Sequence, residues 1–123
     1  MPLVAKRTTT VERRRVIFED AATIIEREYA LDLDLDDVAR RVATSRRQLQ
    51  RAFAEIGDTS FRSYVTEIRM RRAVELLRTG RTPVREVAAN VGYRQPAQFA
   101  KAFRRHHGAA PSSLRRFPQS LAA

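Results

Sequence analysis

Four polar side chains near the middle of the chain have the types and the spacing needed to recognise base pairs. They are Arg46, Arg47, Gln50 and Arg51. At positions i, i+1, i+4 and i+5 of a helix they project from the same side. Arginine donates two hydrogen bonds to guanine O6 and N7, and glutamine pairs with adenine N6 and N7. We predict base contacts for at least two of the four, although a solvated basic helix face is the usual origin of such a run.

The sequence pattern around these residues occurs twice in the chain. Its two copies are residues 38–57 and residues 87–108, about fifty positions apart. Each copy predicts a short helix, a tight turn and a second helix whose outer face is polar or basic. Two such units in a small basic protein favour DNA that one chain contacts in two places.

The second copy offers different chemistry. Its equivalents of the four residues are Pro96 with Ala97, Ala100 and Lys101. Only Lys101 has a hydrogen-bonding side chain, whereas Ala97 can touch a thymine methyl group, and we predict base contacts for these two as well. For the DNA backbone we predict contacts from Ser45, Arg94, Gln95, Gln98, Arg104 and Arg105.

The charge distribution agrees with this difference between the copies. The formal net charge is +10, from 24 Lys and Arg against 14 Asp and Glu. Residues 1–63 carry 12 basic and 11 acidic side chains, and residues 64–123 carry 12 and 3. Such a charge favours nucleic acid as the partner, with an acidic membrane surface second. We expect an asymmetric reader, in which the first unit discriminates between bases and the second mainly attracts phosphates.

Other chemistries are disfavoured. The chain has no cysteine, which excludes disulfides, thiolate zinc sites and a cysteine nucleophile. The adjacent His106 and His107 project apart on a helix, so we expect no metal ion. The aspartates between Asp32 and Asp37 lack the glycine and the glutamate of a calcium loop, so helix capping is the better interpretation. Without a glycine-rich phosphate loop or an identifiable carboxylate pair, we expect neither a cofactor nor an enzyme.

The sequence also predicts a location. No apolar run approaches the roughly 18–20 residues that a membrane span needs. The N-terminal residues have no apolar segment typical of a signal peptide. We therefore expect a soluble, cytoplasmic protein that does not enter a membrane.

Helix signals divide the first half of the chain into short elements. Residues 11–29 have an amphipathic pattern that follows a possible cap at Thr10. Asp34 can cap the next helix. Ser45 and Gln48 form a capping box of the type S-x-x-Q at the start of a third.

A long connector follows the third helix, which Gly57 is expected to end. Residues 60–78 form the longest helix that the pattern predicts. Its apolar face shifts by roughly a third of a turn part-way along, at about 100° per residue. A helix buried by one partner near its start and by another near its end has this pattern, so we interpret it as the connector between two subdomains.

The second half predicts three more helices. Gly80 ends the connector, and Thr82 followed by Pro83 marks a helix start with proline at the first helical position. Gly92 supplies a turn, Gly108 ends the next helix, and Pro111 begins a last short one. The predicted fold is all-α with about seven helices. Its expected parts are a flexible N-terminus (1–10), one domain (11–116) that contains the first unit (34–57), the connector (60–79) and the second unit (82–108), and a tail (117–123).

These residues resemble a known family in order and spacing: the DNA-binding domain of AraC/XylS-type transcriptional regulators. The similarity covers about residues 32–116 and is specific because many positions agree at once. It rests on Ser45 to Phe53, Gly57, Ser60, Tyr64, Arg69, Ala73 to Leu77, Val84, Val87, Ala88, Gly92, Tyr93, Phe99, Lys101, Phe103, Arg104, Gly108, Ala110 and Pro111. Within the family, the chain is most similar to the standalone type of MarA and SoxS, which lack a separate effector-binding domain.

The resemblance implies two helix-turn-helix units joined by a long helix, with both recognition helices in neighbouring major-groove segments of one promoter. It implies a sequence-specific regulator of double-stranded DNA that acts as an activator. A contact with RNA polymerase, which activators of this family commonly make, stays open. Two units in one chain make a dimer unnecessary, so we expect a monomer on DNA. Two other classes stay open: an architectural or nucleoid protein with little base preference, and a regulator whose sensor is a separate protein. The ordered cluster at Arg46 to Arg51 argues against the architectural class.

Departures from the family pattern are informative. Ala43 stands where glycine is usual, which predicts a first turn that is either less tightly kinked or slightly strained. Ala110 replaces a common serine and removes a cap worth on the order of 1 kcal/mol. Arg47 and Pro96 differ from other members, as positions that set sequence preference do.

Two arginine groups have more than one interpretation. Arg13, Arg14 and Arg15 form either a solvated helix face or an extra phosphate contact. For the connector residues Arg69, Arg71 and Arg72 we favour a structural role as partners of Glu67 or Glu75.

Overall fold

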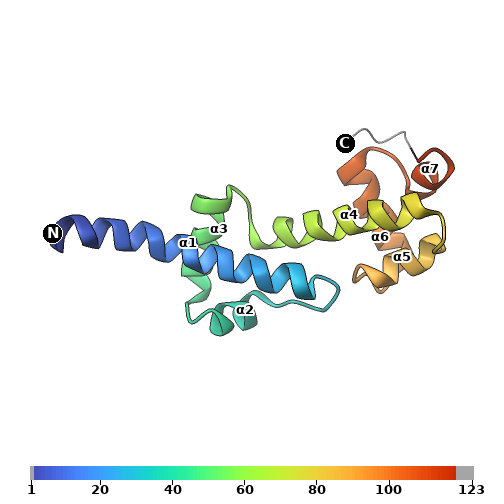
Figure 1. Cartoon of the computed structure of the whole chain (residues 1–123). Helices are drawn as coiled ribbons and strands as arrows, with labels where there is room; N and C mark the ends of the chain where they lie inside the picture. The colour runs from blue at the N-terminus through green and yellow to red at the C-terminus, as the bar shows by residue number, and fades with distance from the viewer. Residues whose placement is uncertain (1, 119–123) are drawn as a thin grey trace. The chain divides into compact units, whose positions relative to one another are not determined.

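The computed structural model describes residues 2–118, and it describes side chains from residue 10 onwards. All regular structure in this part of the chain is helical, which confirms the predicted all-α fold (Figure 1). The helices are α1 (Pro2–Glu28), α2 (Leu35–Arg41), α3 (Arg46–Gly57), α4 (Phe61–Thr79), α5 (Val84–Asn90), α6 (Pro96–His107) and α7 (Pro111–Arg116). None of these helices is long and apolar enough to cross a membrane.

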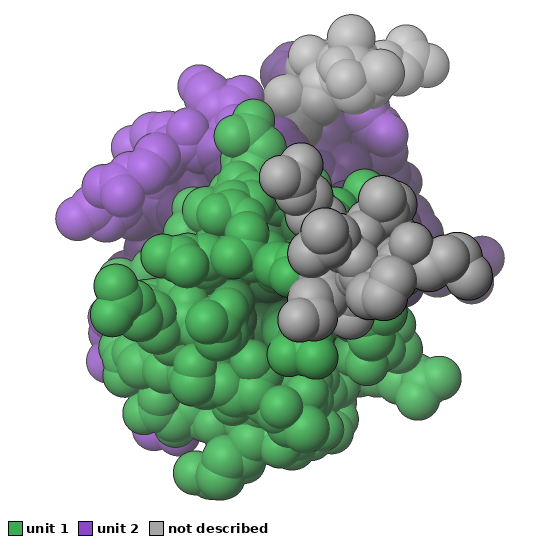
Figure 2. All heavy atoms as spheres, turned by 90° about the vertical axis from the view of Figure 1, so that its left-hand side faces the viewer, with its two compact units in different colours: residues 1–28, 33–65 green, residues 29–32, 66–123 purple. Residues whose placement is uncertain are grey.

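The chain divides into two compact units (Figure 2). Unit 1 comprises the residues up to 28 and residues 33–65, and unit 2 comprises residues 29–32 and those from 66 onwards. Unit 1 therefore contains α1, α2 and α3, whereas unit 2 contains α5, α6 and α7. Helix α4 contributes to both, since the boundary falls between its residues 65 and 66.

Helix α1 differs from its prediction. It begins at Pro2 rather than after Thr10, and at 27 residues it is longer than the 19-residue α4, which we expected to be the longest. Proline suits the first helical position, and no glycine or further proline interrupts residues 3–28. The helix therefore extends over the segment predicted to be flexible. Of the predicted tail, residues 119–123 lie outside the described residues.

The core of unit 1 forms between α1 and α3. Ile17, Ala21 and Ile25 recur every four residues on α1, and all three are buried. They share this core with the fully buried Leu49 and Phe53 of α3.

An aromatic cluster completes that core. The ring of Phe18 packs edge-on against Phe53 at 5.0 Å and against Tyr64 of α4 at 5.8 Å. Edge-to-face pairs of this kind stabilise a core by about 0.5–1.5 kcal/mol beyond the area they bury.

A bidentate ion pair joins α2 to the end of α1. The two guanidinium nitrogens of Arg41 donate to the two carboxylate oxygens of Glu28 at 2.8 and 2.6 Å. These hydrogen bonds lower the pKa of the Glu28 carboxyl below its usual value. The two parallel hydrogen bonds make this contact between α1 and α2 geometrically specific.

Helix α4 has the shifted apolar face that the sequence predicted. Val65 and Ile68 are buried near its start, and Met70, Ala73 and Leu77 are buried further along. The later three belong to the core of unit 2. The other buried members of this core are Val87, Ala88, Val91, Phe99, Phe103 and Leu114.

One helix end was predicted correctly and one helix start wrongly. Gly57 is the last residue of α3, and Asp58 takes the left-handed conformation with φ 52°. Aspartate tolerates that region because its short side chain bonds locally. Pro83 is the N-cap of α5 rather than its first helical residue, and no side chain caps that helix. The backbone carbonyl of Pro83 accepts from the Val87 amide at 3.0 Å.

The glycine at position 57 has a packing reason. A Cβ atom there would lie 2.5 Å from Cε1 of Phe18, much closer than two carbons can approach. Phe18 cannot retreat freely because it is held in the aromatic cluster. The absence of a side chain at Gly57 therefore lets α1 pack closely on the end of α3.

We predict that Gly57→Ala destabilises the protein by about 1–3 kcal/mol, the usual cost of overpacking a core. Helix propensity alone would favour alanine by about 1 kcal/mol, so the two effects have opposite signs. Urea unfolding followed by circular dichroism measures the difference. A variant more stable than the wild type would show that Phe18 does not hold this position.

Candidate nucleic-acid interface

A hydrogen-bonded turn joins α2 to α3. The amide of Ala43 donates to the Arg40 carbonyl at 3.0 Å, and that of Thr44 donates to the Ala39 carbonyl at 2.9 Å. Ala43 has φ 57°, in the left-handed region. This is the Schellman pattern of helix ends, and glycine is the usual residue at its left-handed position. Of the two predicted alternatives for Ala43, its positive φ confirms the strained one.

The same turn joins α5 to α6. Here Gly92 donates to the Ala89 carbonyl at 3.1 Å, and Tyr93 donates to the Ala88 carbonyl at 2.9 Å. Gly92 has φ 102°. The two turns therefore share one hydrogen-bond pattern although their residues differ. The sequence signals at both turns predicted their positions correctly.

The helices that follow the two turns are matched in length and position. Helix α3 covers residues 46–57 and α6 covers residues 96–107, with a shift of fifty positions. Ser45 caps α3 and accepts a hydrogen bond from the Gln48 amide at 3.1 Å, as predicted. Gln95 is the N-cap of α6 without a side-chain hydrogen bond, and Pro96 occupies its first turn.

Helix α3 separates a core face from an exposed face. Leu49 and Phe53 are fully buried. The four predicted base-contacting residues, Arg46, Arg47, Gln50 and Arg51, are all exposed. The structure thus brings them together on the solvent side of one helix, and their contact with bases stays a prediction.

Two of these arginines have carboxylate neighbours that the sequence analysis missed. Arg46 lies 3.3 Å from Asp36 of α2, and Arg51 lies 3.9 Å from Glu55. The second pair has helical i, i+4 spacing and was detectable, whereas the first depends on the fold. Exposed pairs of this kind are worth about 0–1 kcal/mol, so they leave both side chains available to a ligand.

Helix α6 presents a different surface. Ala97, Lys101 and Gln98 are exposed, whereas Ala100 is half-buried. Arg104 and Arg105 are exposed in its last turn, where positive charge suits the helix dipole. Arg94 and Gln95 are exposed just before the helix.

The cations on α6 and just before it differ from Arg46 and Arg51 of α3 in their neighbours. Within the described residues, no carboxylate pairs with Arg94, Lys101, Arg104 or Arg105. Their positive charge is therefore not offset locally. Uncompensated cations along one helix raise the attraction for a polyanion.

Arg69 positions the second turn. Its Nε donates to the Tyr29 carbonyl at 2.7 Å, and one terminal nitrogen donates to the Leu31 carbonyl at 2.9 Å. The guanidinium also lies over the Tyr93 ring at 5.5 Å. Its structural role is therefore achieved through backbone carbonyls rather than through Glu67. Gly92 fits against this assembly, because a Cβ atom there would lie 3.0 Å from the Ala30 carbonyl oxygen.

His107, at the end of α6, is half-buried. Its ring lies 4.5 Å from that of Phe103, and among the described residues its Nε2 has no hydrogen-bond partner. Burial lowers the pKa of His107, and the nearby His106 and Arg78 lower it further. Within the described part of the chain, no three His, Asp or Glu side chains form a metal-binding group.

The fold and the paired turns define a helix-turn-helix protein with two such units in one chain. A family model described as a helix-turn-helix domain matches residues 38–116. The chain belongs to the AraC-type helix-turn-helix family of transcriptional regulators.

Solved structures agree with that assignment. The C-terminal domain of AraT, a response regulator from Geobacillus stearothermophilus, is 34% identical with a TM-score of 0.78, over 81% of this chain and 84% of that one. The DNA-binding domain of AdpA, a global transcriptional factor solved in complex with a target DNA, is 29% identical with a TM-score of 0.74, over 85% and 98%.

A curated relative has a described role. The lactose operon transcription activator of Staphylococcus xylosus is 31% identical over 97 residues, which is 79% of this chain and 35% of the relative. This chain spans about a third of the length of the curated relatives that it matches.

The two turns lead to a paired prediction. Ala43→Gly should stabilise the protein by about 1 kcal/mol, because a left-handed residue with a Cβ atom costs about 1–2 kcal/mol and glycine regains part of this. Gly92→Ala should destabilise it by more than 1 kcal/mol, because the new methyl group adds a close contact to an unfavourable φ. Urea midpoints measure both. Equal effects of the same sign would contradict the conformational explanation.

The lowered pKa of His107 predicts the pH dependence of stability. As pH falls through about 6.5, the usual pKa of histidine, the unfolded chain takes up a proton more readily than the folded one. Stability should therefore be full above that pH and decrease below it. Unfolding free energies at pH 7.5 and 5.5 should differ less for His107→Gln than for His106→Gln or the wild type. An unchanged difference in His107→Gln would assign the effect to other groups.

Proposed function

We propose that this chain is the DNA-binding part of a sequence-specific transcriptional regulator that binds one asymmetric site on double-stranded DNA. In this proposal α3 and α6 enter neighbouring segments of the major groove. The observation that carries it is the exposure of Arg46, Arg47, Gln50 and Arg51 on the solvent side of a helix that follows a helix-turn-helix turn. A helix in that position is the usual reader of base edges.

Helix α3 supplies most of the base discrimination. Its guanidinium and amide groups match the acceptors and donors that guanine and adenine present in the major groove. The pairs with Asp36 and Glu55 hold Arg46 and Arg51 near the helix before DNA arrives. Such exposed pairs exchange readily for a base edge, since each is worth at most about 1 kcal/mol.

Helix α6 supplies mainly attraction to the DNA backbone. Ala97 can touch a thymine methyl group and Lys101 can reach a base, but the helix offers no fork of hydrogen-bond donors. Phosphate contacts are assigned to Ser45, Arg94, Gln95, Gln98, Arg104 and Arg105. Support comes from the absence of carboxylate neighbours around the four cations Arg94, Lys101, Arg104 and Arg105 within the described residues.

The wider role is that of an activator that binds as a monomer and contacts RNA polymerase. Two reading units in one chain make a dimer unnecessary, since together they can span about one helical turn of DNA, roughly 34–36 Å. The similarity to the lactose operon transcription activator supports activation. The contact with RNA polymerase rests on resemblance to the family.

One alternative has an observation in its favour. An architectural protein that binds DNA with little base preference would need the excess positive charge of unit 2 and no more. The net charge of +10 and the alanines on α6 suit that function. The order of the polar residues on α3 does not, because phosphate attraction requires no fixed spacing of arginine and glutamine.

We predict that substitutions in the two units have different effects. Arg51→Ala should cost about 1–3 kcal/mol on the preferred site and relax the preference at one base pair. Arg105→Ala should weaken binding to all sequences alike and reduce the salt slope by about 1. Titrations of a selected site and its single-base variants at several salt concentrations measure both quantities. The asymmetry is refuted if both kinds of substitution reduce base preference equally.

A further inference from the structure

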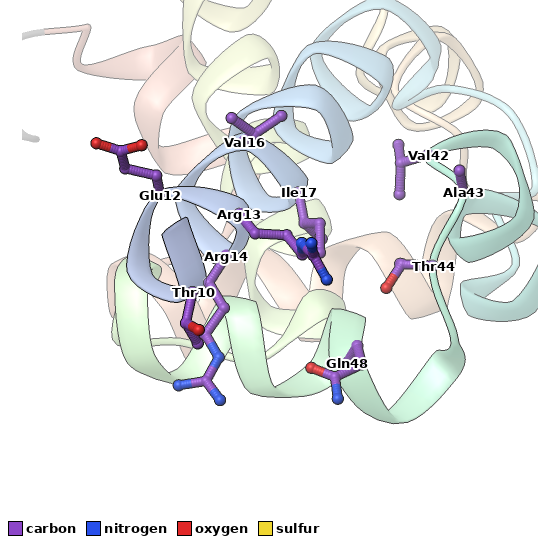
Figure 3. Close-up of a pocket in the computed structure, with 10 residues that line it drawn as sticks. All are labelled: Thr10, Glu12, Arg13, Arg14, Val16, Ile17, Val42, Ala43, Thr44 and Gln48. Carbon is purple, nitrogen blue, oxygen red and sulfur yellow. The ribbon is translucent and has the colours of Figure 1, made fainter. Parts of the chain in front are cut away.

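A cleft separates α1 from the turn of the first helix-turn-helix unit. Its volume is about 730 Å³, and Figure 3 shows the side chains around it. One wall is formed by α1 and the other by the turn and the first residues of α3. The lining residues are Thr10, Glu12, Arg13, Arg14, Val16, Ile17, Val42, Ala43, Thr44 and Gln48.

The two arginines of the cleft have different partners. Arg14 forms an ion pair with Glu55 of α3 at 2.5 Å, so it is already bound within the protein. Arg13 has no ion pair or hydrogen bond within the described residues. In Figure 3 its guanidinium points into the space toward Thr44, whereas the carboxylate of Glu12 points away. Arg13 is therefore an exposed cation at the wall of the cleft, with no compensating partner within the described residues.

The position of the cleft matters for the proposed function. Thr44 immediately precedes Ser45, the N-cap of α3, and Gln48 lies in the first turn of that helix. Both side chains are close in sequence to Arg46 and Arg47. A phosphate that entered the cleft would therefore lie beside the helix that reads bases, at the positive end of its dipole.

The donors in the cleft fit a phosphodiester group. A guanidinium forms charge-assisted hydrogen bonds with phosphate oxygens, and hydroxyl and amide groups such as those of Thr44 and Gln48 add neutral ones. Phosphate contacts of this kind fix the register of a recognition helix without carrying sequence information.

We propose that Arg13 binds a backbone phosphate of DNA next to the base pairs contacted by α3. The DNA interface then extends onto α1, outside residues 38–116, which the helix-turn-helix family model matches. The inference rests on the proposed function, because it needs DNA in front of α3. Helix α1 would thereby both pack against the first helix-turn-helix and fix the position of that helix-turn-helix on the duplex.

Arg15 provides a matched control. It is a neighbouring arginine on α1, exposed, without an ion pair within the described residues, and absent from the lining of the cleft. Arg13→Gln and Arg15→Gln remove the same charge from the same helix. Any difference between them therefore reports position rather than net charge.

The experiment measures the affinity of the wild type and both variants for one selected duplex between 0.05 and 0.3 M salt. Loss of one phosphate contact lowers the salt slope by about 0.9 and the affinity by about fivefold at 0.15 M. We expect these changes in Arg13→Gln, on preferred and scrambled sequences alike, and much smaller ones in Arg15→Gln. Arg13→Lys should retain most of the affinity because the charge remains.

Ethylation interference locates the contact. With the wild type, one phosphate beside the block read by α3 should interfere with binding, and with Arg13→Gln that signal should disappear. Circular dichroism melting of each variant verifies folding. Equal slopes for Arg13→Gln and Arg15→Gln, or an unchanged interference pattern, would overturn the inference while leaving the proposed function intact. A wild type without salt-dependent DNA binding would overturn both.

Discussion

One conformational constraint is repeated in the two units: a single residue with positive φ after a short helix. Ala43 and Gly92 occupy this position. In both turns the amide of this residue and the amide of the next one donate hydrogen bonds to carbonyls of the preceding helix. The bonds satisfy carbonyls at the helix end and set the direction of the next helix. Helices α3 and α6 therefore begin from the same local geometry, although one turn uses alanine at a conformational cost and the other uses glycine with no room for a side chain.

Helices α3 and α6 begin from the same local geometry but present different side chains. In unit 1, Arg46 and Arg51 of α3 have carboxylate neighbours at Asp36 and Glu55, so the outer face combines hydrogen-bond forks with partly compensated charge. In unit 2 the outer face of α6 carries Ala97 beside Lys101, and the cations of this helix have no such neighbours among the described residues. An arginine whose charge is offset by a carboxylate gains binding energy mainly from a specific base edge. Uncompensated positive charge attracts any phosphate. This division of labour is the central claim of the proposal.

The sequence predicted the features that depend on local signals. The turn at Gly92 and the cap at Ser45 are each encoded within one or two turns of helix, and the shifting face of α4 is encoded within that single helix. Features that depend on contacts between distant residues were not predictable in this way. The role of Gly57 requires the position of Phe18, the Arg46–Asp36 pair spans two helices, and the cleft at Arg13 appears only when α1 lies beside the first turn. Helix α1 begins at Pro2 rather than after the start signal at Thr10, since no glycine or further proline interrupts residues 3–28.

The most direct test of the claim is selection of binding sites from a random pool of double-stranded DNA at about 0.15 M salt with excess competitor. Two reading helices in one chain predict an enriched motif of two blocks, about one helical turn apart, or roughly 34–36 Å. Unequal chemistry predicts that one block is defined much more sharply than the other. Tight binding that depends steeply on salt but enriches no motif would contradict the claim and favour an architectural protein held by charge alone.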